Sequence, residues 1–289
     1  MISLGIVTVL FNSDSVLDGF FESLHLQANQ DFKVYLIDNS YTKQSKVLIE
    51  SLIAKWKLEQ NVYHFINDQN VGVAKGNNQG IELALQDNCQ HILLANNDIE
   101  FTQTDLFDQL IITSEESKIV APKVLYHNTN KIWYAGGHIN KYKGLVIHEN
   151  EFAENYPDKR CFTEYAPTCF VVFASEVFKE VGMMDEKYFV YWDDTDFILR
   201  ANQKGFKVLY LPDYVIFHKV SISTGGRASL FSTYYFLRNR LYFIRKHFNG
   251  VSYLSSILYT YLTSVAKIIL YDSGRKKAII KALRDSNKM

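Results

Sequence analysis

The sequence predicts an α/β protein with a mostly parallel, doubly wound sheet, helices on both faces of it, and a C-terminal helical extension. Between residues 4 and 124, short apolar runs alternate with segments of helical period. This alternation is typical of a parallel sheet covered on both faces. Beyond Gly225-Gly226 the pattern changes to long helical segments. The chain has 289 residues, of which 47% are hydrophobic, so one large core can form.

The alternating region divides into short apolar strands and amphipathic helices. In the first helical segment, apolar residues recur on one face with a period of about 3.6 residues. The expected strands are Leu4–Leu10, Lys33–Ile37, Val62–Ile66, His91–Ala95 and Ile119–Val124. The expected helices are Ser15–Gln27, Lys43–Trp56, Val73–Leu85 and Thr104–Ile112.

The middle of the chain departs from this alternation. Residues 126–164 contain glycines, Tyr, Trp and short β-like pieces, which indicate hairpins and loops. Ser175 is expected to cap a short helix that ends at Val181, and Gly205 to stop an acidic helix that runs to about Gln203. The β-like segments are Lys131–Ala135, Leu145–His148, Ala166–Ala174, Lys207–Leu211 and Val215–Phe217, the last leading to His218.

The glycine pair is the predicted boundary between a domain at 1–225 and a helical, basic segment at 226–289. Val251–Tyr271 is long enough for a membrane helix, but its Ser, Thr, Tyr and Lys content makes it a poor hydrocarbon-spanning segment. One interpretation is an interfacial element with Lys and Arg toward anionic headgroups. The other is a helical hairpin that packs on the first domain or forms a homodimer. The expected helices are Ser229–Phe248, Val251–Tyr271 and Gly274–Lys288.

Composition narrows the class of partner and the compartment. Lys+Arg and Asp+Glu both number 31, so the overall charge argues against nucleic acid as a partner. Cys89, Cys161 and Cys169 form neither a CxxC pair nor a zinc spacing, which fits a reducing compartment. The apolar N-terminus lacks a basic region before it and is interpreted as a buried strand rather than a signal peptide. A cytoplasmic location is therefore expected.

Three carboxylates, Asp193, Asp194 and Asp196, crowd into four positions after an aromatic run and before an apolar helical segment. Like charges this close, next to aromatic neighbours, disfavour ionisation. Aspartates are also favoured at helix starts, where they cap free N–H groups. The cluster is therefore either a helix cap or a catalytic site, and Asp193 could cap the helix while Asp194 faces a substrate.

Polar residues follow several of the expected strands: Asn12, Asp38, Asn70 and the run Asn96-Asn97-Asp98. Ligands of open α/β sheets bind beyond the carboxyl ends of the strands. An acidic residue at position 38 can accept hydrogen bonds from a base or ribose, although an Asx turn is an equal alternative.

Gly76 and Gly80 lie four residues apart on one face of an expected helix. Each costs about 1 kcal/mol relative to Ala there, so a ligand or a neighbouring backbone is expected to approach closely. Tight helix–sheet packing is the alternative. The chain has no Walker loop and no GxGxxG after its first strand, which weakens a Rossmann oxidoreductase interpretation.

Asp98 is a candidate ligand for Mg²⁺ or Mn²⁺, hard cations that take oxygen ligands and substrate phosphates. One carboxylate alone is a poor metal site, but a bound diphosphate could supply further oxygens. His218, at another strand end, is either a further ligand or a structural histidine.

Taken in order, these motifs resemble an inverting GT-A glycosyltransferase of family 2, the family that includes bacterial rhamnosyltransferases and galactofuranosyltransferases. The match runs from about residue 4 to 225. It rests on 8–12 (TVLFN), 37–40 (IDNS), 70–80 (NVG…GNNQG), 94–98 (LANND), 182–186 (GMMDE), 191–196 (YWDDTD) and His218 with Ser221 and Ser223.

The resemblance implies a GT-A catalytic domain over 1–225 and a role for each matching residue. Asp38 would bind uracil or thymine, and Asp194 would be the general base. Asp98 and His218 would hold Mn²⁺ or Mg²⁺. Trp192 and Asp196 would contact the donor or acceptor sugar. The remaining nucleotide-site residues would be Asn12, Asn70, Gly76, Asn77 and Asn97.

Two positions depart from the family pattern. Asn96 stands where the first carboxylate of the DxD element is usual, so metal binding would depend more on the donor. Asp193 stands where Glu is usual, and it is the lesser candidate for the base.

The resemblance implies transfer of rhamnose, or of a hexose such as galactofuranose, from a dTDP- or UDP-sugar. The acceptor would be a hydroxyl of a glycan or lipid-linked glycan in cell-surface polysaccharide synthesis, which fits a peripheral location on the inner face of the plasma membrane. A catalytically idle nucleotide-sugar-binding scaffold with the same fold is the alternative.

Overall fold

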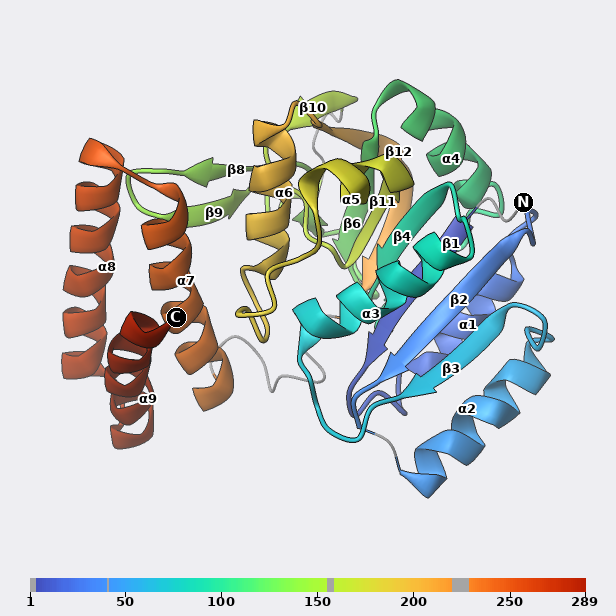
Figure 1. The fold of residues 1–289 in the computed structure, drawn as a ribbon, viewed down its shortest axis with the longest axis horizontal. Coiled ribbons are helices and arrows are strands. Elements are labelled where there is room, and N and C mark those ends of the chain that lie inside the picture. Colours follow the sequence, from blue (N-terminus) through green and yellow to red (C-terminus); the bar gives the residue numbers. More distant parts are fainter. Residues whose placement is uncertain (1–3, 41, 155–158, 220–228) are drawn as a thin grey trace.

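The computed structural model describes residues 4–40, 42–154, 159–219 and 229–289. Its centre is a mixed sheet with the strand order β10-β12-β6-β11-β4-β1-β2-β3, in which β5 pairs with β12 and β7 with β6 (Figure 1). The strands are β1 Leu4–Leu10, β2 Phe32–Asp38, β3 Val62–Ile66, β4 His91–Ala95, β5 Ile99–Glu100, β6 Ile119–Tyr126, β7 Ile132–Tyr134, β10 Cys161–Thr163, β11 Phe170–Ala174 and β12 Val208–His218. A separate hairpin pairs β8 Gly137–Asn140 with β9 Leu145–His148.

The first half of the sheet is parallel, as the alternating pattern predicts. Strands β3, β2, β1 and β4 pair in parallel, with Leu10 opposite Asp38 and Asp38 opposite Ile66. This register brings the segments after β1 and β2 to the same edge of the sheet. The helices of this part are α1 Leu17–His25, α2 Lys43–Lys55, α3 Val73–Gln86 and α4 Leu106–Glu116.

The second half is mixed, which the alternation alone does not predict. Strand β11 runs antiparallel to both β4 and β6, and β12 is parallel to β6. The two strands expected at 207–211 and 215–217 form the single strand β12, because an irregularity between Leu211 and Val215 interrupts the pairing without ending it.

Tight packing of helix α3 on the sheet explains the two glycines of this helix. A Cβ added to Gly80 would meet Val7 Cγ1 at 2.3 Å, and one added to Gly76 would meet Val9 Cγ2 at 2.9 Å. These contacts match the alternative of tight helix–sheet packing, because strand β1 occupies that side of the helix.

Helix α5 Ser175–Val181 precedes the acidic cluster, and helix α6 Asp193–Gln203 begins with it. The expected Ser175 cap is wrong, since Ser175 is already helical and its N-cap position is Ala174. Gly205 follows α6 with a φ of +92°, which fits the predicted stop.

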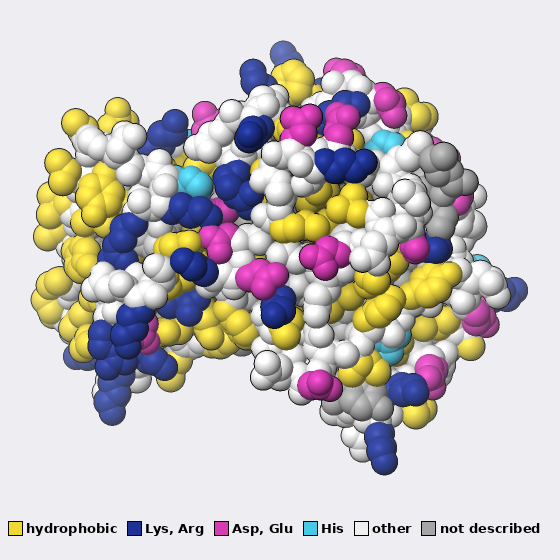
Figure 2. Space-filling model, viewed as in Figure 1, with side chains coloured by type: hydrophobic (Ala, Val, Ile, Leu, Met, Phe, Trp, Pro, Cys, Tyr) yellow, Lys and Arg dark blue, Asp and Glu magenta, His cyan; other side chains and the backbone are white. Residues whose placement is uncertain are grey.

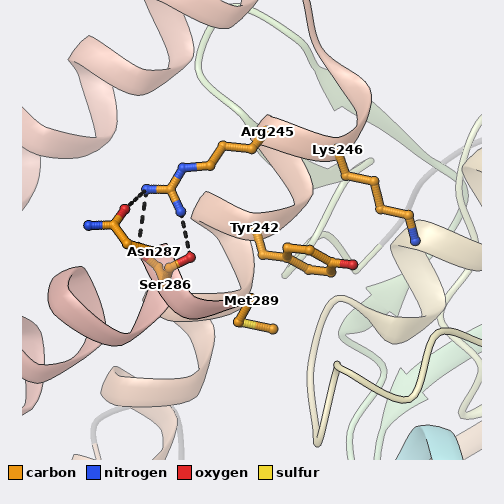
Figure 3. A pocket seen from close by; sticks show the side chains of 6 residues that line it. All are labelled: Tyr242, Arg245, Lys246, Ser286, Asn287 and Met289. Atoms are coloured by element: carbon orange, nitrogen blue, oxygen red, sulfur yellow. Dashed lines mark hydrogen bonds between the residues drawn. The ribbon is translucent and has the colours of Figure 1, made fainter.

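The C-terminal segment forms α7 Leu230–His247, α8 Gly250–Leu270 and α9 Ser273–Asp285, ending in the turn η1 Ser286–Lys288. Figure 1 shows these helices side by side at one end of the molecule, beside α6 and the β8–β9 hairpin. Arg245 on α7 donates hydrogen bonds to Ser286 O (2.6 Å) and Asn287 Oδ1 (2.7 Å), which fastens the chain end to α7 (Figure 3). The predicted boundary at Gly225-Gly226 lies outside the described residues.

Candidate active site

A cavity of about 1080 Å³ joins the ends of several strands to the start of helix α6. It is lined by residues that lie far apart in the chain, including Asn77 on α3, Asp98 after β4, Asp194 on α6 and His218 at the end of β12. The cavity therefore gathers the polar groups that the sequence places after strands.

Unpaired buried polar atoms concentrate on this cavity. Among the described residues, five buried side-chain N or O atoms lack a hydrogen-bond partner, and four of them belong to cavity-lining residues. Such atoms are costly to bury, so their presence indicates a site that a polar ligand or ion completes. The four are Asp98 Oδ1, Trp133 Nε1, Trp192 Nε1 and His218 Nδ1.

Asp98 and His218 form the pair predicted to hold a metal. His218 Nε2 lies 3.1 Å from Asp98 Oδ1, within ion-pair distance but without the geometry of a hydrogen bond, and both side chains are almost fully buried. Within the described ranges no cluster of three or more His, Cys, Asp and Glu side chains has the arrangement of a metal site. The pair fits a cation that takes its remaining ligands from a bound diphosphate and water, because Mg²⁺ and Mn²⁺ favour such oxygens. Asn96 also lines the cavity.

Asp193 and Asp194 lie side by side in the wall of the cavity, but their environments differ. Asp194 Oδ2 accepts a hydrogen bond from Tyr165 Oη (2.7 Å), and its Oδ1 accepts from Thr195 N (2.6 Å) and Thr195 Oγ1 (3.1 Å). Asp193 is only 4% exposed, whereas Asp194 is partly exposed. Asp194 is thus a positioned carboxylate that solvent can reach.

Burial raises the pKa of both aspartates. For Asp193 burial is the main cause, and the charge of Asp194 adds to it. For Asp194 burial again raises the pKa, while the hydrogen bonds from Tyr165 and Thr195 oppose the rise. The pair therefore favours a state with one proton, held by Asp193, and one negative charge, on Asp194.

An unusual backbone conformation starts helix α6. Tyr191 and Trp192 have φ values of 64° and 70°, which non-glycine residues rarely adopt. Asn239 of α7, fully buried, donates from Nδ2 to Val190 O (2.7 Å) and Tyr191 O (3.0 Å) and so supports this turn. The N-cap position is Trp192, without a side-chain cap, and Asp193 is the first residue of the helix rather than its N-cap.

Asn70, Asn77 and Asn97 all line the cavity, as expected for nucleotide-site residues. Asn97 Nδ2 donates to Ser13 Oγ, which fixes the amide. Asn39 lines the same wall and donates to Gly72 O (3.2 Å), although only its neighbour Asp38 was singled out by the strand-end pattern.

The cavity lining does not include Asp38, Asn12 or Gly76. The Asp38 carboxylate is 1% exposed, accepts a hydrogen bond from Ser40 N (2.9 Å) and lies 3.1 Å from His64 Nε2. These contacts match the Asx-turn alternative. The structure therefore separates Asp38 from the cavity by turning its carboxylate toward strand β3.

Asp196 also lies away from the cavity. Its side chain is fully buried, and its carboxylate contacts Arg200 Nε (2.8 Å), Lys246 Nζ (2.7 Å) and His247 Nε2 (2.7 Å). The expected sugar contact of Asp196 does not fit this position, because cations of α6 and α7 surround it. Trp192, by contrast, lines the cavity with its indole N–H unpaired.

Sequence reasoning missed Tyr165, Trp133 and His148, which line the same cavity. His148 Nδ1 lies 2.8 Å from Trp133 O, and the Trp133 ring meets the His218 ring edge to face at 4.7 Å. They belong to the hairpin region 126–165, where no periodic pattern marks them. The only signal is the enrichment of Tyr and Trp there.

This fold is that of the GT-A class of glycosyltransferases. Residues 5–182 match the model of the family described as glycosyl transferase family 2, and the chain belongs to that family.

Two curated relatives are sugar transferases. The chain is 20% identical to the low-salt glycan biosynthesis hexosyltransferase Agl10 of Haloferax volcanii over 82% of its own length and 74% of the relative. It is 30% identical to the dTDP-rhamnosyl transferase RfbF of Shigella flexneri, over 65% of its own length and 64% of the relative.

Solved structures show the same fold at low identity. GalNAc-T7 with UDP, GalNAc and Mn²⁺ superposes with a TM-score of 0.65 and 16% identity, covering 85% of this chain and 48% of that one. TarS 1–349 of S. aureus in complex with UDP gives 0.62 and 14% identity, covering 98% of this chain and 80% of that one.

Proposed function

We propose that this protein is an inverting glycosyltransferase that moves a sugar from a UDP- or dTDP-linked donor to a hydroxyl group. The observation that carries the proposal is one cavity that holds both an aspartate pair and the Asp98–His218 pair. The first pair suits proton removal from an acceptor. The second suits a cation beside a diphosphate leaving group.

Asp194 is the proposed general base. The acceptor oxygen attacks the anomeric carbon, its proton passes to Asp194, and the bond from that carbon to the diphosphate oxygen breaks. The nucleoside diphosphate leaves with the electron pair, and the single displacement inverts the anomeric configuration. Because Asp193 is protonated, the pair carries a single negative charge, on Asp194. This charge also stabilises an oxocarbenium-like transition state.

Asp98 and His218 would hold Mg²⁺ or Mn²⁺. When bound, this cation would neutralise charge that develops on the leaving diphosphate. Asn70, Asn77 and Asn97 offer amides for the nucleotide part of the donor. Trp192 presents an aromatic face and an unpaired N–H to a sugar.

The preferred donors are dTDP-rhamnose and a UDP-hexose such as UDP-galactofuranose. The curated name of the Shigella relative, a dTDP-rhamnosyl transferase, supports the first. The proposed acceptor is a lipid-linked glycan in cell-surface polysaccharide synthesis, and the proposed location is the cytoplasmic face of the plasma membrane.

Helix α8 supports membrane contact, because its polar face is buried and its apolar face is exposed. The face that packs inside the protein carries Ser256, Thr260 and Ser264, all buried. The exposed face is apolar, and by length and composition α8 could even cross a membrane. Figure 2 shows hydrophobic side chains over the α8 end of the molecule and Lys and Arg gathered near α9. The exposed side chains are Val251, Leu254, Leu258, Leu262, Val265, Ile269 and Leu270.

A surface helix with this pattern normally buries its apolar face. Lipid is the occupant we propose for the α8 face, with the basic side chains of α9 toward anionic headgroups. A homo-oligomer built on the same face is the competing occupant.

The function is tested with a panel of UDP-, dTDP- and GDP-sugars incubated with Mn²⁺ and the protein. The expected result is release of UDP or dTDP from one donor, by slow hydrolysis alone and faster with a glycan acceptor. If no donor is consumed although UDP or dTDP binds, the protein is instead a nucleotide-sugar-binding scaffold. Asn96 in place of a first carboxylate is the feature that favours that alternative.

A further inference from the structure

The cavity extends beyond the aspartates into a second arm between the C-terminal helices. Residues of α7, α8 and α9 line it together, so this arm exists only because the extension folds back on the catalytic part. The lining residues include Phe236, Arg240, Thr263, Lys267, Arg275 and Ile279.

Arg240 of α7 is a buried cation in this arm. Only 6% of the residue is exposed, and it donates from Nε to Gly144 O (2.8 Å) and from Nη2 to Lys143 O (2.5 Å). Within the described ranges no carboxylate forms an ion pair with it. Buried charges are normally paired, so an uncompensated guanidinium facing a cavity indicates an anionic ligand.

A second cation lies close to the first. Lys267 is the only charged residue of α8, and its side chain forms no hydrogen bond or ion pair with the described residues. Lys267 is itself exposed to solvent, but partial desolvation and the positive charge of Arg240 lower its pKa. Arg275 of α9 differs, because it is already paired with Asp272 at 3.4 Å. The buried Arg240 and the exposed Lys267 therefore form a cationic pair that no carboxylate of the described residues neutralises.

We propose that Arg240 and Lys267 form a binding site for a phosphate or diphosphate ester, the anionic group of the acceptor. The assignment of this ligand as the acceptor rests on the proposed function. The assignment of an anion rests on the cavity and its two cations alone. Guanidinium groups recognise phosphate oxygens through their fixed planar donors, and an ammonium adds a point charge.

The two faces of α8 favour an amphiphilic ester over a free anion. Thr263, Ser264 and Lys267 line the cavity, whereas Leu262, Val265 and Ile269 are exposed on the helix surface. With about 3.6 residues per turn, these two sets lie on opposite sides of the helix. A ligand held at Lys267 thus lies one helix diameter from the apolar surface, where an attached hydrocarbon chain could rest.

Binding is measured by titration calorimetry on the full chain saturated with UDP and Mg²⁺, so that the nucleotide site is filled. The probes are geranyl diphosphate, inorganic diphosphate and geraniol. Lys267→Glu reverses the charge at a side chain without partners, and Lys179→Glu on α5 is the matched control outside the cavity. Arg240→Met is the second variant, checked for folding by circular dichroism.

The expected result is that geranyl diphosphate binds at least about tenfold more tightly than geraniol, and that Lys267→Glu and folded Arg240→Met lose this advantage while Lys179→Glu keeps it. If inorganic diphosphate bound as tightly as geranyl diphosphate, the anion site would be supported and its ligand would be a free anion. Equal binding of geraniol and geranyl diphosphate, or equal effects of Lys267→Glu and Lys179→Glu, would overturn the proposal. UDP affinity and donor hydrolysis, measured separately, report on the proposed function itself.

Discussion

At the scale of single residues, the two adjacent aspartates illustrate how similar side chains acquire different roles. Tyr165 and Thr195 hold the Asp194 carboxylate at the cavity, while Asp193 is more deeply buried. The protonation of the pair follows from that difference, because the more deeply buried carboxyl pays more for its charge.

Asp194→Asn should reduce turnover about 10²- to 10⁴-fold, because the acceptor proton loses its base. UDP affinity, measured by calorimetry, should stay unchanged. Asp193→Asn should be milder, since an amide resembles a protonated carboxyl. The pKa of Asp194 is raised above 3.8, so Asp194 takes up a proton at a pH above that value as the solution is acidified. Wild-type turnover should fall in the same pH range. If turnover fell more in Asp193→Asn than in Asp194→Asn, Asp193 rather than Asp194 would be the general base.

Asn239→Ala should lower turnover with little change in UDP affinity, because the strained turn at 191–192 loses both hydrogen bonds from Asn239 Nδ2. Leaving two carbonyls unpaired costs about 1–3 kcal/mol of stability. Asn61→Ala is the matched control, since Asn61 also donates to two carbonyls, at Gln30 and Phe32. An equal loss of turnover in both variants would argue against a positioning role for Asn239.

At the scale of elements, an ion cluster joins helix α6 to helix α7. Arg200 of α6 and Lys246 and His247 of α7 surround Asp196. The sequence predicted both helices closely but could not predict this contact, because the partners lie up to 51 residues apart in the chain. Contacts across such separations depend on how helices dock, which local periodicity does not encode.

Burial alone would raise the pKa of Asp196, but His247, Lys246 and Arg200 lower it to about 2. A depressed pKa stabilises the folded state above the unfolded value of 3.8, and this contribution is lost as pH falls toward 2. Urea unfolding should show wild type losing about 2 kcal/mol more than Asp196→Asn between about pH 5 and pH 2. Parallel losses in the two proteins would contradict the linkage.

At the scale of the whole molecule, the C-terminal helices complete the site rather than follow it as a separate appendage. Arg240 holds the β8–β9 turn at Gly144, where an added Cβ would meet Ile244 Cδ1 at 2.6 Å. The same helices carry the exposed apolar face of α8, so the proposed anion site and the proposed membrane contact lie in one part of the molecule.

The variant Leu254→Ser/Leu258→Ser/Ile269→Ser should lose co-sedimentation with vesicles of phosphatidylcholine and phosphatidylglycerol. Each inserted side chain contributes about 1.5–3 kcal/mol, so the affinity should fall more than about 100-fold. Neutral vesicles should bind wild type more weakly, because α9 loses its anionic partner. If the substitutions instead convert a lipid-free dimer into a monomer and leave sedimentation unchanged, the face binds a second copy.

The sequence by itself determined the parallel half of the sheet, the extents of most helices and the positions of Asp98, Asp194 and His218, because hydrophobic period and strand-end chemistry are local properties. Tertiary structure alone decided that β11 runs antiparallel, that Asp38 and Asp196 turn away from the cavity, and that Tyr165, Trp133 and Arg240 enter it. Those outcomes depend on strand pairing and helix docking between distant segments. The acidic stretch at α6 was visible in the sequence, but its division into a proposed base, a proposed protonated neighbour and an ion-pair anchor came from three different tertiary environments.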